Sequence, residues 1–465
     1  MTDDALGDSD LVDLVARIDR HEVSPAEVVQ ASLARAYAVE PQVNAVVDWV
    51  PDPAPLSDAA DRPLRGIPTF IKDNEALAGL PTRQGSRAVT DRPSTTSMPW
   101  ARQVIALGAT PLGKSTMPEF GMTPTTESLL SGATRNPWDL TRSTGGSSGG
   151  SAALVAAGVT PLAHANDGGG SIRIPASCCG LVGLKPTRGR IVDVRDVERL
   201  PINIIAQGVV TRTVRDTAFY LSVAERAYRN LALPPIGHVT APGPRLRIAV
   251  IPSSVAWGTT DPAVAEAVRS TASLCESMGH QVEEWDFPFD AQIGMDFLRY
   301  WEFLAYSISR WGDRLYGSGF DRSLLEPLTV ELARIFRSGP GLLAPALRRL
   351  KRFGRVYADT FADVDVVLSP TVAHEPPPIG YLGPTVDPRT HLVRVLRYVS
   401  MAPLQNVTGA PAISLPLGQS PTGLPLGVQA AAGWGRERTL LELALELEQA
   451  HPFRRPPTEP VGARG

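Results

Sequence analysis

Short apolar runs alternate with longer helical patterns along most of the chain. Four apolar stretches have the length of buried strands: residues 66–72, 162–165, 246–251 and 364–369. Three further segments predict helices, the last of them amphipathic: residues 152–157, 263–278 and 440–450. Strands that alternate with helices predict a layered α/β fold, which we expect to form one compact domain.

Two parts of the chain have a different character. Ser24 to Glu27 (SPAE) forms a capping box with proline at the first helical position, so residues 1–64 are expected to form an N-terminal helical segment. Residues 293–357 also predict helix and are rich in aromatic side chains. These could line a pocket for substrate but are expected mainly to pack in the core. They are Phe297, Tyr300, Trp301, Phe303, Tyr306 and Trp311.

The charge balance and the cysteine content narrow the class of protein. A formal net charge of −3 argues against a nucleic-acid-binding protein, and the basic residues at 348–355 are expected to form a solvated helix face. No apolar run approaches the ~20 residues of a membrane span, and the acidic N-terminus lacks the apolar core of a signal peptide. Three cysteines, two of them adjacent, fit a reducing compartment. These features predict a cytoplasmic protein that binds neither nucleic acid nor membrane.

Residues 108–115 (GATPLGKS) match the P-loop pattern of nucleotide-binding proteins letter for letter. Pro111 removes one of the loop amides that would hold a phosphate, and residues 100–107 predict the end of a helix where a strand should precede the loop. A P-loop nucleotide-binding protein is therefore a disfavoured alternative.

Residues 146–150 (GSSGG) have the form of a nucleophile elbow with Ser148 at its centre. An elbow follows an apolar strand, but residues 139–144 are polar, and none of the seven histidines lies in a context typical of a partner. Cys178 and Cys179 could supply a thiol nucleophile, although buried cysteines are more often inert packing. Both alternatives are disfavoured.

Ser147 and Ser171 each lie in a glycine-rich turn, and Lys72 ends a predicted strand upstream. A run of glycines before a serine can turn several backbone N–H groups inward, where they stabilise a developing negative charge. A desolvated neutral lysine can take a proton from a hydroxyl, and lysine is rare in this chain, with 4 residues against 41 arginines. The pattern predicts nucleophilic catalysis, with ordinary glycine-serine loops as the open alternative.

These residues and their surroundings resemble the amidase signature family. The long central match covers residues 145–187 (GGSSGGSAALVAAG, then AHANDGGGSIRIPASCCGLVGLKPT). Shorter matches lie at residues 66–74, 112–121, 135–138, 405–414 and 423–429. The resemblance implies an amidase-signature fold, in which a large mixed β-sheet is flanked by helices on both faces. It makes residues 65–465 the catalytic domain, with a signature core at 65–240 and a less clearly matched helical region at 290–400 that shapes the substrate site.

The resemblance implies a role for each candidate residue. Ser171 matches the nucleophile, Ser147 the serine that follows a cis peptide bond, and Lys72 the base of a Ser–cis-Ser–Lys triad. The oxyanion hole is matched by the backbone amides of Gly168, Gly169, Gly170 and Ser171. Supporting roles fall to Ser148 and to a pair formed by Asp167 and Arg173, and Lys185 is expected in a structural ion pair. No metal or cofactor is required.

The activity implied is hydrolysis of a carboxylic amide to carboxylate and amine through a seryl acyl-enzyme. The substrate would be a small molecule with a linear or cyclic amide bond, because the match is nearest to the general amidases and the hydrolases of aminohexanoate cyclic dimers. A rival within the family is the glutaminase subunit of a tRNA-dependent amidotransferase, which needs partner subunits. The sequence does not fix the oligomeric state, and a homodimer is compatible with it.

Overall fold

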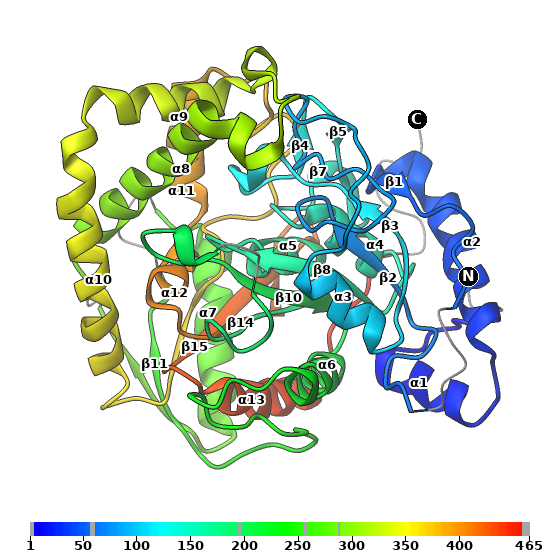
Figure 1. The fold of residues 1–465 in the computed structure, drawn as a ribbon. Coiled ribbons are helices and arrows are strands. Elements are labelled where there is room, and N and C mark those ends of the chain that lie inside the picture. Colours follow the sequence, from blue (N-terminus) through cyan, green and yellow to red (C-terminus); the bar gives the residue numbers. More distant parts are fainter. Residues whose placement is uncertain (1–3, 56–60, 194–196, 254–258, 287–288, 458–465) are drawn as a thin grey trace.

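A large mixed β-sheet runs through the centre of the protein in a computed structural model that describes residues 4–55, 61–193, 197–253, 259–286 and 289–457 (Figure 1). Its strands are β8 (Leu162–Asp167), β9 (Val182–Lys185), β10 (Ala206–Thr211), β11 (Arg247–Val250), β12 (Gln281–Glu284), β13 (Val366–Pro370), β14 (Ala412–Gln419) and β15 (Pro425–Ala432). They follow one another across the sheet in the order β12-β11-β13-β15-β14-β9-β10-β8. β11 pairs in parallel with β12 and β13, and the other neighbours pair antiparallel. The predicted α/β class and mixed sheet are confirmed.

A smaller sheet brings Lys72 to the edge of the large one. It consists of β1 (Val46–Trp49), β3 (Thr110–Ser115) and β2 (Pro68–Lys72), in the order β1-β3-β2. The hydroxyl of Thr69 on β2 donates to the carbonyl of Leu162 on β8, and the Lys72 amide donates to His164 Nδ1. Two short antiparallel pairs complete the strands described: β4 (Glu127–Ser128) with β5 (Gly132–Ala133), and β6 (Arg135–Asn136) with β7 (Asp139–Ser143).

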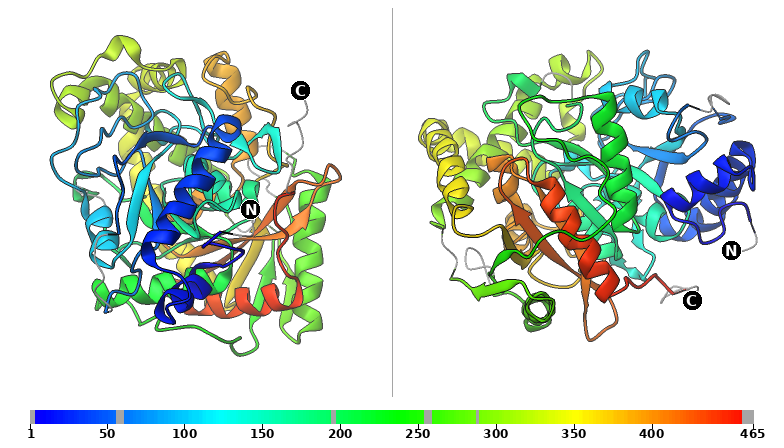
Figure 2. Two further views of the ribbon diagram at one scale, coloured as in Figure 1. Left: turned by 90° about the vertical axis from the view of Figure 1, so that its right-hand side faces the viewer. Right: turned by 90° about the horizontal axis from the view of Figure 1, so that it is seen from below.

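Successive residues of the central strands face opposite sides of the sheet and enter different hydrophobic clusters. Val366 and Leu368 join one cluster while Val367 joins another, and Leu162 and Ala163 separate in the same way. Both faces therefore need cover. One face packs against α3 (Pro99–Ala106), α6 (Val214–Ala227), α7 (Pro262–Ser277) and α13 (Glu437–Ala450). Figure 2 (right), seen from below, shows α6 and α13 side by side in front of the sheet.

The opposite face carries α4 (Gly149–Ala156) and α5 (Arg173–Cys179), followed by a group of helices at the upper left of Figure 1. This group, called the helical region below, comprises α8 (Gln292–Tyr316), α9 (Pro327–Ser338), α10 (Leu343–Thr360), α11 (Pro388–Tyr398) and α12 (Ala402–Thr408). The helices predicted at 293–357 are thus confirmed. The basic side chains at 348–355 are exposed along α10, so the expected solvated face is also confirmed. Short 3-10 turns lie at Glu119–Gly121, Val197–Arg199, Arg322–Leu324 and Pro340–Leu342.

The N-terminal segment contains α1 (Leu11–Asp19) and α2 (Pro25–Val43), at the right of Figure 1. The predicted capping box is present, because Ser24 Oγ accepts the amide of Glu27 while the Glu27 carboxylate accepts the amide of Ser24. The segment also supplies β1, so it is not wholly helical, and residues 1–3 and 56–60 lie outside the described residues.

The residues that match the P-loop pattern form a strand and not a phosphate-binding loop. Residues 110–115 form β3, where a phosphate-binding loop would have to turn into a helix at Lys114. Lys114 is buried, with Nζ 3.4 Å from Asp73 Oδ1. The preceding helix, α3, ends at Ala106, as predicted.

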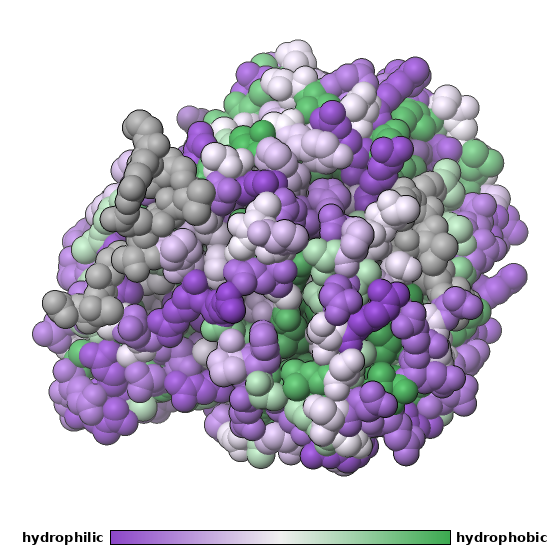
Figure 3. Space-filling model, turned by 180° about the vertical axis from the view of Figure 1, so that it is seen from behind, coloured by the Kyte–Doolittle hydropathy of each residue, from purple (hydrophilic) through white to green (hydrophobic). Residues whose placement is uncertain are grey.

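No helix in the described part of the chain is both long and apolar enough to cross a membrane. Figure 3 shows the rear of the molecule, where hydrophilic side chains predominate and hydrophobic ones are seen mainly right of centre.

Candidate active site

Lys72 and Ser147 meet in the protein interior. Lys72 is fully buried at the end of β2, and its Nζ is hydrogen-bonded to Ser147 Oγ and to Asn166 Oδ1, each at 2.8 Å. Burial lowers the pKa of Lys72 from 10.5 to about 7, although the negative charge of Asp167 acts in the opposite direction. A large share of this amine is therefore neutral near neutral pH and able to accept a proton from the serine hydroxyl.

Close backbone packing holds the turn that carries Ser147. The Gly146–Ser147 peptide bond is cis. A Cβ on Gly146 would lie 2.6 Å from the carbonyl oxygen of Thr125, so no larger residue fits there. The Gly149 amide donates to Thr126 Oγ1 at 3.0 Å, and α4 starts at this residue. The serine hydroxyl is thereby fixed opposite Lys72.

Ser171 lies on the wall of a cavity with an empty volume of about 1130 Å³, which is partly open to solvent. Gly146 and Gly169 line the same cavity, so the Ser147 turn and the glycine loop before Ser171 face one space. Within the described residues no hydrogen bond joins Ser171 Oγ to Ser147 Oγ. Catalytic hydrogen bonds are often long before substrate binds. The structure thus brings Lys72 and Ser147 into direct contact and places Ser171 on the cavity beside them.

The loop between β8 and α5 presents three free amides rather than four. The Gly170 amide donates to Asp167 Oδ1 at 2.7 Å, so the expectation that it serves an oxyanion hole is not met in this structure. The amides of Gly168, Gly169 and Ser171 have no acceptor among the described residues. Gly170 has a φ of +123°, which favours glycine, and a Cβ there would lie 2.7 Å from Ile174 Cδ1. Its fixed conformation turns the amide toward the carboxylate.

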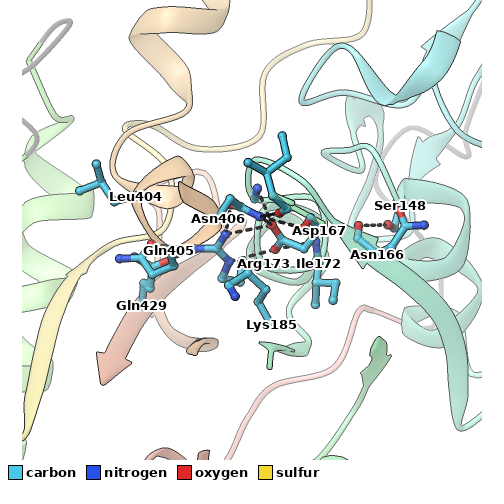
Figure 4. A network of polar contacts seen from close by, with 12 residues as sticks. Ser148, Asn166, Asp167, Ile172, Arg173, Lys185, Leu404, Gln405, Asn406 and Gln429 are labelled. Atoms are coloured by element: carbon cyan, nitrogen blue, oxygen red, sulfur yellow. Dashed lines mark hydrogen bonds and ion pairs between the residues drawn. The ribbon is translucent and has the colours of Figure 1, made fainter. Parts of the chain in front are cut away.

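A buried polar network is built around Asp167 and Arg173, which flank Ser171 in the chain (Figure 4). Arg173 and Asp167 are both fully buried and form two parallel hydrogen bonds of 2.9 Å, which confirms the predicted pair. The remaining contacts of the Arg173 guanidinium are to side-chain oxygens of Gln405, Asn406 and Gln429. Burial acts to raise the pKa of Asp167, but the charge and hydrogen bonds of Arg173 outweigh it and hold this pKa far below its ordinary value.

Asp167 in turn holds the chain on both sides of Ser171. One carboxylate oxygen accepts the Gly170 amide, and the other accepts the Ile172 amide at 3.1 Å. A charged carboxylate accepting several donors fixes the backbone between them. The pair therefore positions the loop that carries Ser171.

Lys185 is buried beside this network, but it does not form the expected ion pair (Figure 4). Its Nζ donates to the Pro186 carbonyl at 2.8 Å, and no carboxylate of the described residues lies within ion-pair distance. Burial, with the neighbouring charge of Arg173, lowers the pKa of Lys185 to about 7. The prediction was wrong because Asp167 is already occupied by Arg173, Asn406 and two backbone amides.

The residues disfavoured as nucleophiles, Ser148, Cys178 and Cys179, do not line the cavity. Ser148 is fully buried, and its Oγ donates to the Asn166 carbonyl at 3.3 Å. Although residues 139–143 do form a strand, β7, it is short and polar. Cys178 and Cys179 are buried free thiols, and burial raises the pKa of Cys178 to about 12, which makes a thiolate scarce.

Two aromatic residues of α8 line the cavity. Phe297 and Trp301 stack with ring centroids 5.5 Å apart, and a Cβ on Gly169 would lie 3.5 Å from Phe297 Cζ. Tyr300 instead points into the core, where its hydroxyl donates to the Ile202 carbonyl at 2.7 Å. The expectation of core packing is right for Tyr300. Phe297 and Trp301 also pack against the core clusters but line the cavity as well, and their spacing of four residues puts both on one helix face.

Three polar residues that hold the site were not singled out from the sequence. Asn166 contacts Lys72, as described above. His164 accepts the Lys72 amide and is paired through Nε2 with Gln207 at 2.9 Å; burial lowers its pKa to about 3, so it is neutral. Asn406 donates to the Asp167 and Ile204 carbonyls. The available signal was their place inside the matched segments, since none has a distinctive spacing of its own.

No group of three or more His, Cys, Asp or Glu side chains in the described part of the chain is arranged to hold a metal ion.

Comparison with known proteins places this geometry in context. The model of the Amidase family matches residues 27–441. The Mycobacterium leprae protein named "Putative amidase AmiC" is 47% identical over 459 residues, which cover 97% of each chain. The 6-aminohexanoate-cyclic-dimer hydrolase of a Pseudomonas species (strain NK87) is 36% identical over 94% of each chain. Among solved structures, a 6-aminohexanoate cyclic dimer hydrolase complexed with substrate superimposes with a TM-score of 0.85 at 31% identity, over 96% of this chain and 98% of that one.

Proposed function

The chain belongs to the amidase family and is an amidohydrolase, and from this premise we propose that it cleaves its substrate through an acyl-enzyme formed on Ser171. The observation that carries the proposal is the hydrogen bond between a desolvated Lys72 and Ser147, beside a cavity that Ser171 also lines.

In this mechanism Lys72 acts as the base. The neutral amine takes the proton of Ser147, and Ser147 takes the proton of Ser171 as the Ser171 oxygen attacks the amide carbonyl. The tetrahedral oxyanion is stabilised by the free amides of Gly168, Gly169 and Ser171; one such donor typically contributes roughly 100- to 1000-fold in rate. Return of the proton along the same path releases the amine, and water then hydrolyses the ester on Ser171.

The Asp167–Arg173 pair supports this chemistry without touching the reacting atoms. By binding the Gly170 and Ile172 amides, Asp167 orients the backbone on both sides of the nucleophile. Preorganised donors stabilise a developing charge better than donors that must reorient.

We propose a small-molecule substrate with a linear or cyclic amide bond, since relatives over nearly the full length are named amidases and cyclic-dimer hydrolases. The alternative of a glutaminase subunit is not favoured by these relatives. The three buried free cysteines support a cytoplasmic location. A homodimer stays a prediction.

Labelling with a fluorophosphonate, followed by mass spectrometry of the labelled peptide, tests the nucleophile. The label is expected on Ser171, and Ser171→Ala should lose both the label and turnover of amides. In Ser148→Ala the label should remain on Ser171, because Ser148 contacts the Asn166 carbonyl and does not line the cavity. A label on Ser148 or on a cysteine would reject the assignment.

A further inference from the structure

The cavity beside Ser171 has an almost entirely apolar wall. Its side chains come mainly from the helical region, among them Phe297, Trp301, Leu332, Leu396 and Leu404. Among the described residues that line it there is no lysine, arginine or histidine. A group that enters this cavity therefore exchanges water for hydrocarbon, without meeting a positive charge.

The few polar residues that line the cavity do not change the apolar character of its wall. Thr123 already shares a hydrogen bond of 3.1 Å with His391. Asp290 is exposed, which places it at the open end, and its charge repels anions. Ser400 Oγ is buried with no hydrogen-bond partner among the described residues, so one hydroxyl is available for a neutral polar group of a ligand.

We propose that this cavity selects amides whose acyl group is apolar and uncharged, and rejects acyl groups that carry a carboxylate. The inference rests on the proposed function and specifies its substrate class. A carboxylate in this wall would lose its hydration and gain no cationic partner, whereas each methylene placed there leaves water.

The experiment compares matched p-nitroanilides with the wild-type chain. From propanoyl to hexanoyl, kcat/KM should rise about fourfold per methylene that is buried. Replacing the terminal methyl of the hexanoyl group by a carboxylate, which gives the hexanedioyl monoanilide, should lower kcat/KM about 100-fold. The terminal carboxamide of the same length should fall between the two, because Ser400 can bond to it. A carboxylate substrate turned over within about threefold of the hexanoyl compound would overturn the proposal.

A positive charge introduced into the cavity wall tests whether the wall causes the selectivity. Leu396 lies on α11, lines the cavity, is only partly buried and belongs to none of the hydrophobic clusters, so Leu396→Arg should fold. The variant should raise the ratio of hexanedioyl to hexanoyl turnover at least about tenfold, by supplying the missing cation. Val393→Arg adds the same charge to an exposed position of α11 that does not line the cavity, and should leave the ratio unchanged. An equal rise in both variants would contradict selection by the wall.

Failure of this inference can be told apart from failure of the proposed function. If the fluorophosphonate labels Ser171 and the charged and apolar anilides react equally well, the function stands and the selectivity is wrong. If Ser171 is not labelled and no anilide is hydrolysed, both are wrong. Should Leu396→Arg not fold, the wild-type comparison alone decides the question.

Discussion

The two sides of Ser171 are built in opposite ways. Behind it, the Asp167–Arg173 network is fully buried, and the hydrogen-bonding groups of both side chains are closely satisfied by neighbours. In front of it, the cavity wall is apolar and offers almost no hydrogen bonds. A satisfied polar network is rigid because each group has a fixed partner, whereas an apolar wall accepts any group of suitable shape and polarity. The polar side therefore fixes the backbone around Ser171, and in the function proposed here the apolar side selects the substrate.

The two sides also come mostly from different parts of the chain. The polar side uses the strands and turns of residues 162–185 together with residues 405–429, and these belong to the segments that resemble the amidase signature family most closely. The apolar side uses α8, α9 and α11, where the resemblance is weaker. α12 contributes to both sides, because Gln405 and Asn406 contact Arg173 while Leu404 and Val407 line the cavity. Substitutions in the two regions should therefore affect different quantities: rate and stability on the polar side, substrate choice on the apolar side.

The largest effect is expected from Lys72→Met, which removes the base and preserves much of the side-chain volume. We expect kcat/KM to fall about 1000-fold. Loss of structure should be small, because Asn166 Oδ1 keeps its hydrogen bond from Asn74. The control is Lys185→Met, which removes an equally buried lysine that does not contact Ser147. Equal losses in the two variants, measured as steady-state rates at matched protein concentration, would show that Lys72 has no special role.

A substitution of Arg173, on the polar side, should mainly lower the stability of the fold. Arg173→Ala leaves the Asp167 carboxylate buried without its cation, which typically destabilises a fold by about 3–5 kcal/mol. Thermal and urea unfolding should show an early transition, accompanied by loss of activity. Arg334→Ala, which breaks an exposed ion pair with Glu331 on α9, should shift the transition far less. If both variants unfolded alike, the Asp167–Arg173 pair would not have the stabilising role assigned to it here.

The pH dependence of activity tests the proposed base, Lys72, whose Nζ is hydrogen-bonded to Asn166 at the end of β8. Since burial lowers the pKa of Lys72 to about 7, the active neutral form predominates above this pH, and only about one molecule in ten carries it one unit below. We expect kcat/KM to fall about tenfold per unit as pH drops below 7. Burial also lowers the pKa of Lys185 to about 7, so the same profile in Lys185→Met assigns the titration to Lys72. A flat profile between pH 5.5 and 8 would argue against a lysine base.

The smallest effect on the kinetic constants should come from replacing a side chain of the apolar cavity wall by a smaller one. Trp301→Phe removes part of the cavity wall and the hydrogen bond from the indole to the Met122 carbonyl, at 3.2 Å. We expect KM for an apolar anilide to rise roughly threefold to tenfold, with kcat little changed. Trp434→Phe, at a half-exposed tryptophan that does not line the cavity, serves as the control and should behave as the wild type. A fall in kcat for Trp301→Phe alone would instead give this residue a part in positioning the reaction.

Much of the candidate site could be anticipated because the proposed chemistry depends on residue types with few substitutes. A neutral amine base needs a lysine, the nucleophile needs a hydroxyl, and sharp turns before it need glycine. The contacts of Lys72 with Ser147 and of Asp167 with Arg173 agree with those expectations. Two predictions failed: the ion pair of Lys185, and a Gly170 amide available to an oxyanion. Both depend on which of several nearby groups the Asp167 carboxylate binds, and the sequence does not reveal this choice.

The hydrophobic pattern of the sequence predicted the layered α/β class, and its resemblance to the amidase signature family predicted the mixed sheet and the candidate site residues. Only the tertiary structure decided which faces became cavity and which became core. Phe297, Tyr300 and Trp301 look alike in an apolar helical pattern, and packing turned two of them toward Ser171 and one away. The physical reason is that a helix repeats every 3.6 residues whatever it faces, so an apolar stripe that lines a substrate cavity and one that fills the core have the same signature until the neighbouring elements are in place.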